Sequence, residues 1–320
     1  MNQGYAVLGI DIGGTHIKAG VVDLQGHISD EVSVAVGEEI RTETGLIRTL
    51  KELYNACGTT QKLSAVGIGV AGVIDAQAGI VTQSPNFPLW DNFALAQKFS
   101  ESGVDVPIFI ENDANSVALG EVLFGSAKGI RNLIFLTLGT GVGGALILNG
   151  ELWRGESGMA GEIGHMVVFP HGHPCGCGSF GCLEQYASQV GLRRAVMERE
   201  LEIDDASRWI NDPNLPKFVA DLAVSGNEAA LECFESMGYA LGLALGSLLN
   251  VLNVKHIGLG GGVAAAFPLF EVPMRHTMES HSFRAVHSNV KIFTGSLGNS
   301  AGILGATAPA FARITNNGSP

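Results

Sequence analysis

The sequence predicts an α/β protein with two related halves. Predicted strands alternate with predicted helices along the 320 residues, and a unit of strand, glycine-rich turn and strand occurs near residue 12 and again near residue 140. Alternation of this kind is typical of the α/β class. A chain of this length has room for two domains, and 46 % apolar residues are enough to form a core in each.

The N-terminal third is predicted to be rich in strands. Apolar runs over residues 5–11 and 17–24 flank a glycine turn, and a third strand follows over 27–35. A helix is predicted over 41–57, because its apolar side chains recur at helical spacing. The apolar face of that helix consists of Leu46, Ile47, Leu50, Leu53 and Tyr54.

Two strands and two helices complete this half. The strands are predicted over 64–72 and 107–112, and a helix over 92–102 lies between them in the sequence. The second helix is predicted over 113–125, with Asn112 or Asp113 as its N-cap. Strand and helix therefore alternate up to residue 125.

The pattern restarts at residue 131, which suggests an internal duplication. Strands over 131–139 and 142–150 flank a second glycine turn, and residues 189–253 are predicted to be mostly helical. A strand over 256–260 ends in a run of glycines, and a C-terminal helix is predicted over 298–313.

Composition narrows the classes of partner. The formal net charge is −12, whereas binding to nucleic acid needs a basic face, so no nucleic-acid partner is predicted. Residues 1–10 lack the pattern of a signal peptide, and cytoplasmic localisation is expected. The uncharged stretch 237–254 could mimic a membrane span. We favour a helix buried in the protein and expect no membrane partner, because the stretch contains two Asn and leads directly into a strand.

A polar turn follows the first strand. In "DIGGTHIK", Asp11 stands at the strand end beside Gly13, Gly14 and Thr15, and Lys18 follows. Glycines allow backbone N–H groups to approach a phosphate, and the aspartate could hold Mg²⁺ through water. A plain β-turn with a polar tip is the alternative, and it is favoured when this turn is considered alone.

Two further glycine turns make that alternative less attractive. The stretch "LGTGVGG" contains Gly139, Thr140 and Gly141, and "GLGGGV" contains Gly261 and Gly262. The first of these matches neither a P-loop nor a dinucleotide fingerprint, since no Gly-Lys-Ser/Thr follows and a strand rather than a helix comes next. Three glycine turns that each follow a strand are consistent with sites for phosphates and a nucleoside.

The stretch "IENDANSVALGE" places Asn112 and Asp113 where a strand becomes a helix. One interpretation is an N-cap, worth about 1 kcal/mol. The other is a carboxylate that acts as a base on a hydroxyl group. The spacing leaves these two interpretations open.

Three cysteines occur within eight residues, at Cys175, Cys177 and Cys182. A zinc site needs four sulfur or imidazole ligands, and the histidines at 165, 171 and 173 are close enough in sequence to complete the set. A metal is favoured over a redox pair because of the third thiol and the adjacent histidines. The solitary Cys57 and Cys233 are expected to be core residues.

Taken together, these motifs resemble the ROK family of bacterial sugar kinases and related repressors. The resemblance covers about residues 7–310, and its most specific part is "GEIGHMVVFPHGHPCGCGSFGCLEQYAS" over 161–188. It implies a two-lobed, actin-like ATPase (ribonuclease H-like) fold with nucleotide and sugar in the cleft between the lobes. We expect a small lobe from 1–118 with 300–320, and a large lobe from 119–299 that carries a zinc loop.

The resemblance also implies roles for individual residues. Asp113 corresponds to the catalytic base. Sugar ligands are expected at Gly72, Asn86, Asn112, Asp113, Glu162, His165 and Glu184. Contacts to Mg·ATP are expected at Asp11, Gly13, Gly14, Thr15, Lys18, Gly139, Thr140, Gly141, Gly261 and Gly262. Structural Zn²⁺ is expected on His165, Cys175, Cys177 and Cys182. His16 stands where many relatives have Lys, which puts one phosphate-side contact in doubt.

The implied activity is ATP-dependent phosphorylation of a hexose. The stretch "SPNFPLW" over 84–90 favours glucose, with N-acetylmannosamine, N-acetylglucosamine, fructose or allose as alternatives. A non-catalytic sugar sensor is less favoured, because the ATP motifs are present. A repressor is disfavoured because the first motif begins at residue 11, which leaves no room for a helix-turn-helix. A homodimer or a dimer of dimers is expected by resemblance.

Overall fold

The computed structural model describes residues 5–58, 62–199, 201, 212 and 214–317. Contacts divide the chain into two compact units. Unit 1 comprises residues 1–129, 152–160 and 296–320, and unit 2 comprises 130–151 and 161–295. The boundary expected at residues 118 and 119 falls inside helix α3 (Asp113–Phe124), which packs against α11 (Ala301–Ala306) in unit 1.

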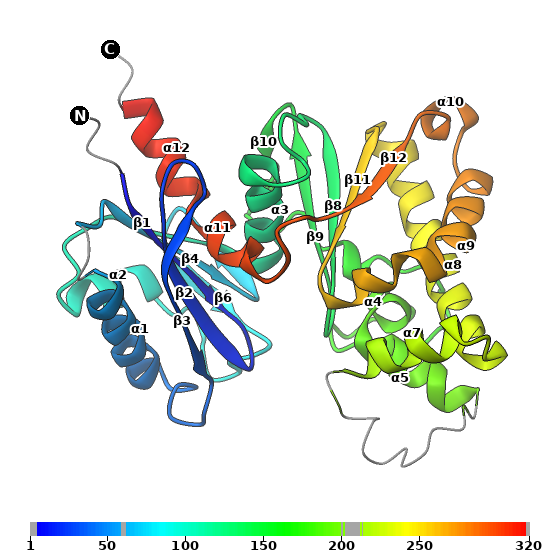
Figure 1. Cartoon of the computed structure of the whole chain (residues 1–320), viewed down its shortest axis with the longest axis horizontal. Helices are drawn as coiled ribbons and strands as arrows, with labels where there is room; N and C mark the ends of the chain where they lie inside the picture. The colour runs from blue at the N-terminus through cyan, green and yellow to red at the C-terminus, as the bar shows by residue number, and fades with distance from the viewer. Residues whose placement is uncertain (1–4, 59–61, 200, 202–211, 213, 318–320) are drawn as a thin grey trace. The chain divides into compact units, whose positions relative to one another are not determined.

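Unit 1 is built on a five-stranded sheet of order β3-β2-β1-β4-β7 (Figure 1). The strands are β1 (Val7–Ile12), β2 (His16–Val22), β3 (Ile28–Ala35), β4 (Ala65–Val70) and β7 (Ile108–Asn112). The first three form an antiparallel meander, and β4 and β7 add to β1 in parallel. The parallel strands β1, β4 and β7 therefore end at one edge of the sheet, where Asp11 and Asn112 stand.

Helices cover both faces of this sheet. Leu8 and Ile10 of β1 belong to the same core as Leu46 of α1, whereas Val7 packs with Ile303 of α11. Such alternation follows from the two-residue period of a strand. The remaining elements of the unit are α1 (Glu43–Cys57), β5 (Val73–Asp75), β6 (Ile80–Gln83), α2 (Leu95–Glu101), a 3-10 turn (Gly298–Ser300) and α12 (Ala308–Asn317).

Unit 2 repeats the plan with the sheet order β10-β9-β8-β11-β12. The strands are β8 (Leu133–Leu138), β9 (Val142–Leu148), β10 (Glu151–Leu152), β11 (His256–Gly260) and β12 (Lys291–Thr294). As in unit 1, an antiparallel hairpin is extended by two parallel strands. The shared plan agrees with the internal duplication that the repeated glycine turns suggest.

The helices of unit 2 bury one large core against this sheet. They are two 3-10 turns (Ile163–His165 and Gly262–Ala266), α4 (Glu184–Ala187), α5 (Gln189–Glu198), α7 (Leu215–Val224), α8 (Glu228–Leu252), α9 (Phe267–Ser280) and α10 (Arg284–His287). Within the region 189–253 that was predicted to be mostly helical, residues 200, 202–211 and 213 lie outside the described residues.

The uncharged stretch 237–254 belongs largely to α8 and is a packing face. Gly238 and Gly242 lie against the backbone of α9, where a Cβ would meet Phe270 O at 2.6 Å and Met274 O at 2.6 Å. Among the described residues, no helix is long and apolar enough to span a bilayer.

The single C-terminal helix predicted over 298–313 is wrong in one respect, because it is divided. α11 ends at Ala306, Thr307 interrupts it, and α12 begins at Ala308. Pro309 lies in the first turn of α12, where its missing N–H has no intrahelical acceptor to lose, whereas an uninterrupted helix would place it in the interior.

Candidate active site and metal centre

The first glycine turn connects β1 and β2. Asp11 pairs with Lys18 across the hairpin, and Gly13 N–H donates to His16 O at 3.0 Å. Burial, and then the nearby carboxylate of Asp113, raise the pKa of Asp11 to about 6, while Lys18 acts in the opposite direction. Two carboxylates predicted from separate motifs therefore lie close enough in unit 1 to influence each other.

The strand-to-helix junction distinguishes the roles of Asn112 and Asp113. Asn112 is the N-cap of α3: its Oδ1 accepts from Asn115 N–H at 3.1 Å, and its Nδ2 donates to Gly72 O at 3.1 Å. Asp113 is the first residue of the helix and is therefore not needed as the cap. Burial raises the pKa of its carboxyl group, although nearby backbone N–H groups oppose the rise.

Gly72 and Asn86 lie beside these elements in unit 1. Gly72 has φ +133°, and a Cβ there would overlap the backbone of Gln83, so only glycine fits. A Cβ on Gly14 would lie 2.8 Å from Asn86 Oδ1. The predicted sugar segment at Asn86 and the predicted phosphate turn at Gly14 are thus neighbours.

Sequence reasoning missed the residue that joins these two segments. Arg41 donates from one guanidinium nitrogen to Asn86 O at 2.7 Å and from another to Gly14 O at 3.2 Å. It precedes the N-cap Thr42 of α1 in a stretch that carries no recognisable motif. Nothing in the sequence could have indicated it.

In unit 2, two of the glycine turns meet at one cavity. Gly139, Thr140 and Gly262 line a space of about 350 Å³. Gln189, Asn214, Pro216, Lys217 and Val263 complete the lining, and sequence reasoning missed all five. Gly141 and Gly261 lie apart from the lining: Gly141 abuts the Glu184 carboxylate, and Gly261, with φ +84°, abuts the backbone of Leu138.

The three predicted sugar ligands of unit 2 lie on short helical turns. Glu162 precedes the turn that ends at His165, and its carboxylate lies 4.0 Å from His165 Nε2. Glu184 is the first residue of α4, and its Oε2 accepts from Val142 N–H at 3.1 Å. Glu184 therefore contacts the glycine turn that leads into β9.

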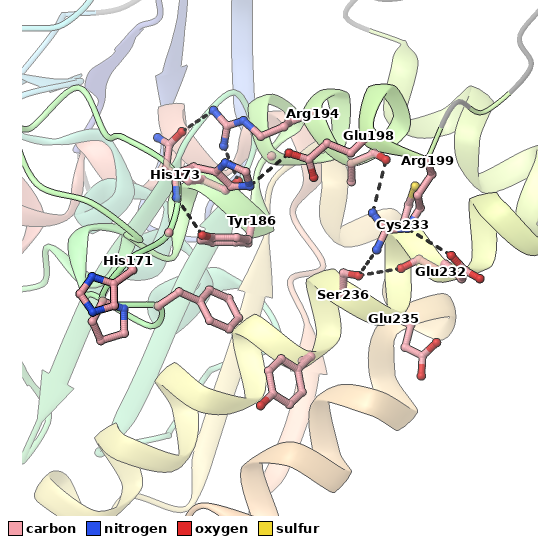
Figure 2. A pocket seen from close by; sticks show the side chains of 17 residues that line it. His171, His173, Tyr186, Arg194, Glu198, Arg199, Glu232, Cys233, Glu235 and Ser236 are labelled. Carbon is pink, nitrogen blue, oxygen red and sulfur yellow. Dashed lines mark hydrogen bonds and ion pairs between the residues drawn. The ribbon is translucent and has the colours of Figure 1, made fainter.

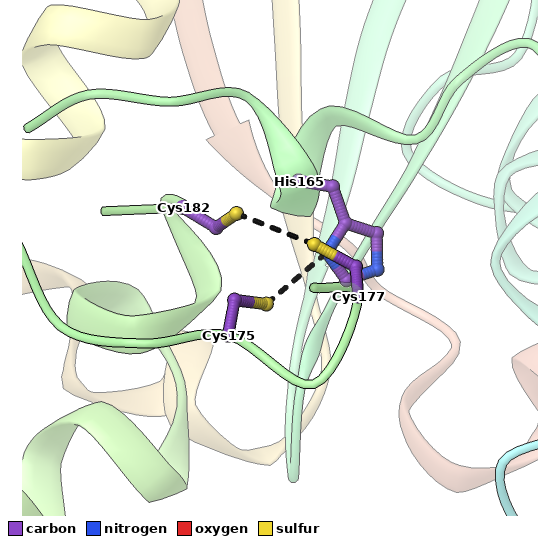
Figure 3. Close-up of side chains that lie close together, drawn as sticks. All are labelled: His165, Cys175, Cys177 and Cys182. Carbon is purple, nitrogen blue, oxygen red and sulfur yellow. Dashed lines mark hydrogen bonds between the residues drawn. The ribbon is translucent and has the colours of Figure 1, made fainter. Parts of the chain in front are cut away.

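The predicted metal ligands converge. Figure 3 shows His165, Cys175, Cys177 and Cys182 turned towards one another, and their ligand atoms all lie within 4.8 Å. Cys175 Sγ lies 3.6 Å from His165 Nδ1, and Cys177 Sγ lies 3.7 Å from Cys182 Sγ. A tetrahedron with Zn–S about 2.3 Å and Zn–N about 2.0 Å has edges of about 3.8 Å between sulfurs and about 3.6 Å between sulfur and nitrogen. The donor set fits zinc, and the longest separations between ligand atoms would shorten by up to about 1 Å on binding.

The electrostatics of the thiols also favour a cation. Burial and the neighbouring thiols raise the pKa of Cys182 to about 12, whereas a backbone hydrogen bond from Ser179 lowers that of Cys177. Zinc binds cysteine as the thiolate. A bound zinc ion would therefore supply the positive charge that stabilises the thiolate of the buried Cys182.

The other two candidate histidines lie outside the cluster. His173 donates its backbone N–H to Tyr186 Oη at 3.0 Å and places Nε2 3.4 Å from a Glu198 carboxylate oxygen. His171 and His173 instead line a cavity of about 910 Å³, bordered by α5 and α8, in which Arg199 contacts Ser236 (Figure 2). No predicted catalytic, nucleotide or metal residue lines that cavity.

The model of the ROK family matches residues 7–312. This protein belongs to the ROK family. It is 33 % identical to a glucokinase of Halalkalibacterium halodurans, over 93 % of this chain and 92 % of the relative. It is 32 % identical to a glucokinase of Thermotoga maritima, over 94 % and 96 %.

Solved ROK structures share the fold. A ROK family glucokinase from Streptomyces griseus, in complex with glucose and AMPPNP, aligns with TM-score 0.80 at 33 % identity and covers 94 % of this chain and 97 % of its own. The ROK hexokinase from Thermus thermophilus aligns with TM-score 0.78 at 29 % identity, over 97 % and 99 %. The predicted actin-like ATPase fold is confirmed.

Repressors also belong to the ROK relatives. The xylose repressor of Bacillus subtilis is 30 % identical, over 95 % of this chain and 76 % of the repressor. The match therefore leaves about a quarter of the repressor without a counterpart in this sequence.

Proposed function

We propose that this ROK protein is a kinase that transfers the γ-phosphoryl group of ATP to glucose. The observation that carries the proposal is the strand end of unit 1, where the partly buried carboxylates of Asp11 and Asp113 lie close enough to interact, in a chain similar to glucokinases over nearly its whole length. A second support is the cavity at which Gly139, Thr140 and Gly262 meet.

Asp113 is the proposed general base. Asn112 already caps α3, so the Asp113 carboxylate is available for chemistry, and burial raises its pKa towards the range useful for proton transfer. The base takes the proton of a sugar hydroxyl, which we assign to C6. The hydroxyl oxygen bonds to the γ-phosphorus while the bond from that phosphorus to the β–γ bridging oxygen breaks, and ADP leaves.

The glycine turns are the proposed binding elements for Mg·ATP. Phosphoryl transfer requires positioning and charge neutralisation rather than covalent help from the protein. In unit 1 the backbone N–H groups of Gly14 and Thr15 can supply this positioning, whereas Gly13 N–H already donates to His16 O and closes the turn. In unit 2 the proposed elements are the turns with Gly139, Thr140 and Gly141 and with Gly261 and Gly262, of which Gly139, Thr140 and Gly262 line the cavity. Mg²⁺ bound with ATP neutralises phosphate charge, and we assign Asp11 to hold it through water, with Lys18 nearby.

The proposed sugar ligands are polar groups that can satisfy hydroxyls. They are Asn86, Asn112, Asp113, Glu162, His165 and Glu184, with Gly72 as a backbone contact. His165 is proposed to serve two sites, since Nδ1 lies beside Cys175 and Nε2 faces Glu162. Structural Zn²⁺ on His165, Cys175, Cys177 and Cys182 would order the segment that carries Glu184.

The test is a panel of glucose, 2-deoxyglucose, mannose, fructose, allose and two N-acetylhexosamines with Mg·ATP, followed by ADP release. Glucose should give the highest kcat/KM. The 2-deoxy sugar should be used poorly, because a buried polar group would lose its partner. If an N-acetylhexosamine, fructose or allose gives a higher kcat/KM than glucose, that sugar and not glucose is the preferred substrate.

A sensor related to the xylose repressors is the second candidate, supported by their similarity to this chain. It predicts sugar binding by calorimetry without sugar-dependent ADP release, so the same panel separates the two. A homodimer or dimer of dimers and a cytoplasmic location remain predictions, and light scattering coupled to size-exclusion chromatography tests the former.

A further inference from the structure

A buried carboxylate lies directly before the proposed base. Glu111, in β7, is 2 % exposed. Its Oε1 accepts from Asn112 N–H at 3.0 Å and from Asn115 Nδ2 at 2.9 Å. Those two donors flank Asp113, one in the residue before it and one in the first turn of α3. Oε1 of Glu111 therefore fixes the residues on either side of Asp113, the proposed base.

The other oxygen of Glu111 is held by a residue from a distant part of the sequence. Arg154 donates to Oε2 from Nε at 2.9 Å and from a terminal nitrogen at 2.5 Å. Arg154 belongs to residues 152–160, a segment of unit 1 that is inserted between two stretches of unit 2. The segment closes on itself, since Ala160 N–H donates to Arg154 O at 3.0 Å.

We propose that Arg154 is a positioning residue for the base Asp113, and that it acts through Glu111. The inference rests on the proposed function, which assigns the base. Arg154 supplies the charge that lets Glu111 stay buried as an acceptor, and Glu111 in turn fixes Asn112 and Asn115 on either side of Asp113. A shift of about 1 Å in a catalytic group can cost about 100-fold in rate.

The residues adjoining Arg154 add a consequence for substrate binding. The segment 152–160 leads directly into Gly161 and Glu162, and then into His165. The ion pair between Arg154 and Glu111 therefore holds the start of a segment that continues into Glu162 and His165, two of the proposed sugar ligands. Loss of Arg154 should nevertheless act first on kcat, because the direct contact of its guanidinium is with Glu111.

The experiment compares Arg154→Met, Arg154→Lys, Glu111→Gln and the double variant Glu111→Gln/Arg154→Met. Arg154→Met should lower kcat about 10- to 100-fold, with KM for glucose and ATP within about threefold of the wild type. Arg154→Lys should restore part of kcat, because it keeps the charge but not the planar fork. The double variant should exceed Arg154→Met in kcat, since a neutral amide needs no counter-charge and still offers an oxygen to Asn112 N–H.

The matched control is Arg199→Met in unit 2, which removes a guanidinium bonded to Ser236 and paired with Glu232. It should lower the thermal midpoint without lowering kcat. A wild-type kcat in Arg154→Met, a rise in glucose KM larger than the fall in kcat, or a double variant no better than the single one would overturn the inference. If Arg154→Met does not fold, the inference is tested on Arg154→Lys and Glu111→Gln, each of which should lower kcat at near-normal KM, and wild-type kcat in both would overturn it.

Failure of the proposed function would give a different result. Full activity in Asp113→Asn would remove the base assignment itself, whatever Arg154 does. A large loss in Asp113→Asn together with no effect at Arg154 would leave the base in place and exclude the positioning role.

Discussion

Glu184 Oε2 accepts a hydrogen bond from Val142 N–H at 3.1 Å. This contact joins the start of α4, two residues after Cys182, to the glycine turn between β8 and β9. The neighbouring Gly141 makes the approach possible, because a Cβ there would overlap Glu184 Oε2. One carboxylate thus links the segment with the Cys/His cluster to the glycine turn proposed to bind nucleotide, within unit 2.

Gly141→Ala should therefore displace Glu184. We expect KM for glucose to rise about 10-fold, as one charged hydrogen-bonding partner of the sugar is lost, which is worth about 1.5 kcal/mol or more. The control is Gly139→Ala, whose Cβ would meet nothing within 4 Å and which should act on ATP rather than on glucose. Steady-state kinetics in both substrates distinguish them. An unchanged glucose KM in Gly141→Ala would remove Glu184 from the sugar site.

Asp113→Asn keeps the shape and most hydrogen bonds of the proposed base but removes its affinity for a proton. A general base typically contributes about 10²- to 10⁴-fold, so kcat should fall by that factor while KM for the sugar changes far less. Because burial raises the pKa of Asp113, wild-type kcat should rise with pH as this carboxyl group ionises. A variant that keeps more than about a tenth of the wild-type kcat would contradict the role of base.

Much of this arrangement follows from local sequence patterns. Strand periodicity and glycine turns predicted most strands of the two units, and the spacing of Cys175, Cys177 and Cys182 predicted that these side chains gather in one cluster. These signals are short-range, because the ligands are close in sequence and the turns require glycine. The identity of the fourth ligand was left open by spacing alone, and the geometry selects His165 over His171 and His173.

The contacts that sequence reasoning missed are long-range ones between common residue types. Arg41 contacts Asn86 across 45 residues of sequence, and Lys217 of α7 lines the cavity beside Gly139, Thr140 and Gly262. Neither residue carries a periodic or motif signal, since an exposed basic residue near a helix is ordinary. Only the tertiary fold brings them to the site.

Lys217 gives a prediction of its own. It is exposed at the rim of the cavity that Gly139, Thr140 and Gly262 line, where an ammonium group would attract ATP. Lys217→Met should raise KM for ATP about 3- to 10-fold, because a solvated ion pair is worth up to about 1 kcal/mol, and the effect should shrink at high salt. Lys255→Met, exposed beside β11 and remote from the cavity lining, is the control. No difference between the two variants would exclude Lys217 from nucleotide binding.

Removal of the proposed structural zinc should loosen the segment around its ligands and should not remove a catalytic group. Four protein ligands make a closed site with no position for a reactive water. Cys177→Ser should lower zinc below one ion per chain by elemental analysis, raise the sugar KM through Glu184 and His165, and affect ATP binding less. Cys233→Ala, a buried thiol outside the cluster, should keep the zinc content. A zinc-free wild type that is fully active and equally stable would show that these thiols serve another purpose.

Asp11 links the active site to stability. Its pKa is about 6 in the folded protein and 3.8 in a model peptide, so the folded state holds the proton more tightly. Below pH 3.8 Asp11 is protonated in both states and does not lower the free energy of unfolding. As pH rises from there through about 6, Asp11 lowers the free energy of unfolding progressively. A shift of roughly two pKa units corresponds to about 3 kcal/mol at most.

Asp11→Asn should therefore stabilise the protein at pH 8 and about half as much at pH 5, while lowering kcat because the proposed Mg²⁺ partner is lost. The measurement is the thermal midpoint of the metal-free protein at both pH values, with Asp221→Asn on exposed α7 surface as the control. The sign is informative, because most substitutions at an ordered polar residue destabilise. If the thermal midpoint of Asp11→Asn at pH 8 is equal to or below that of the wild type, the ionised Asp11 carboxylate does not destabilise the fold.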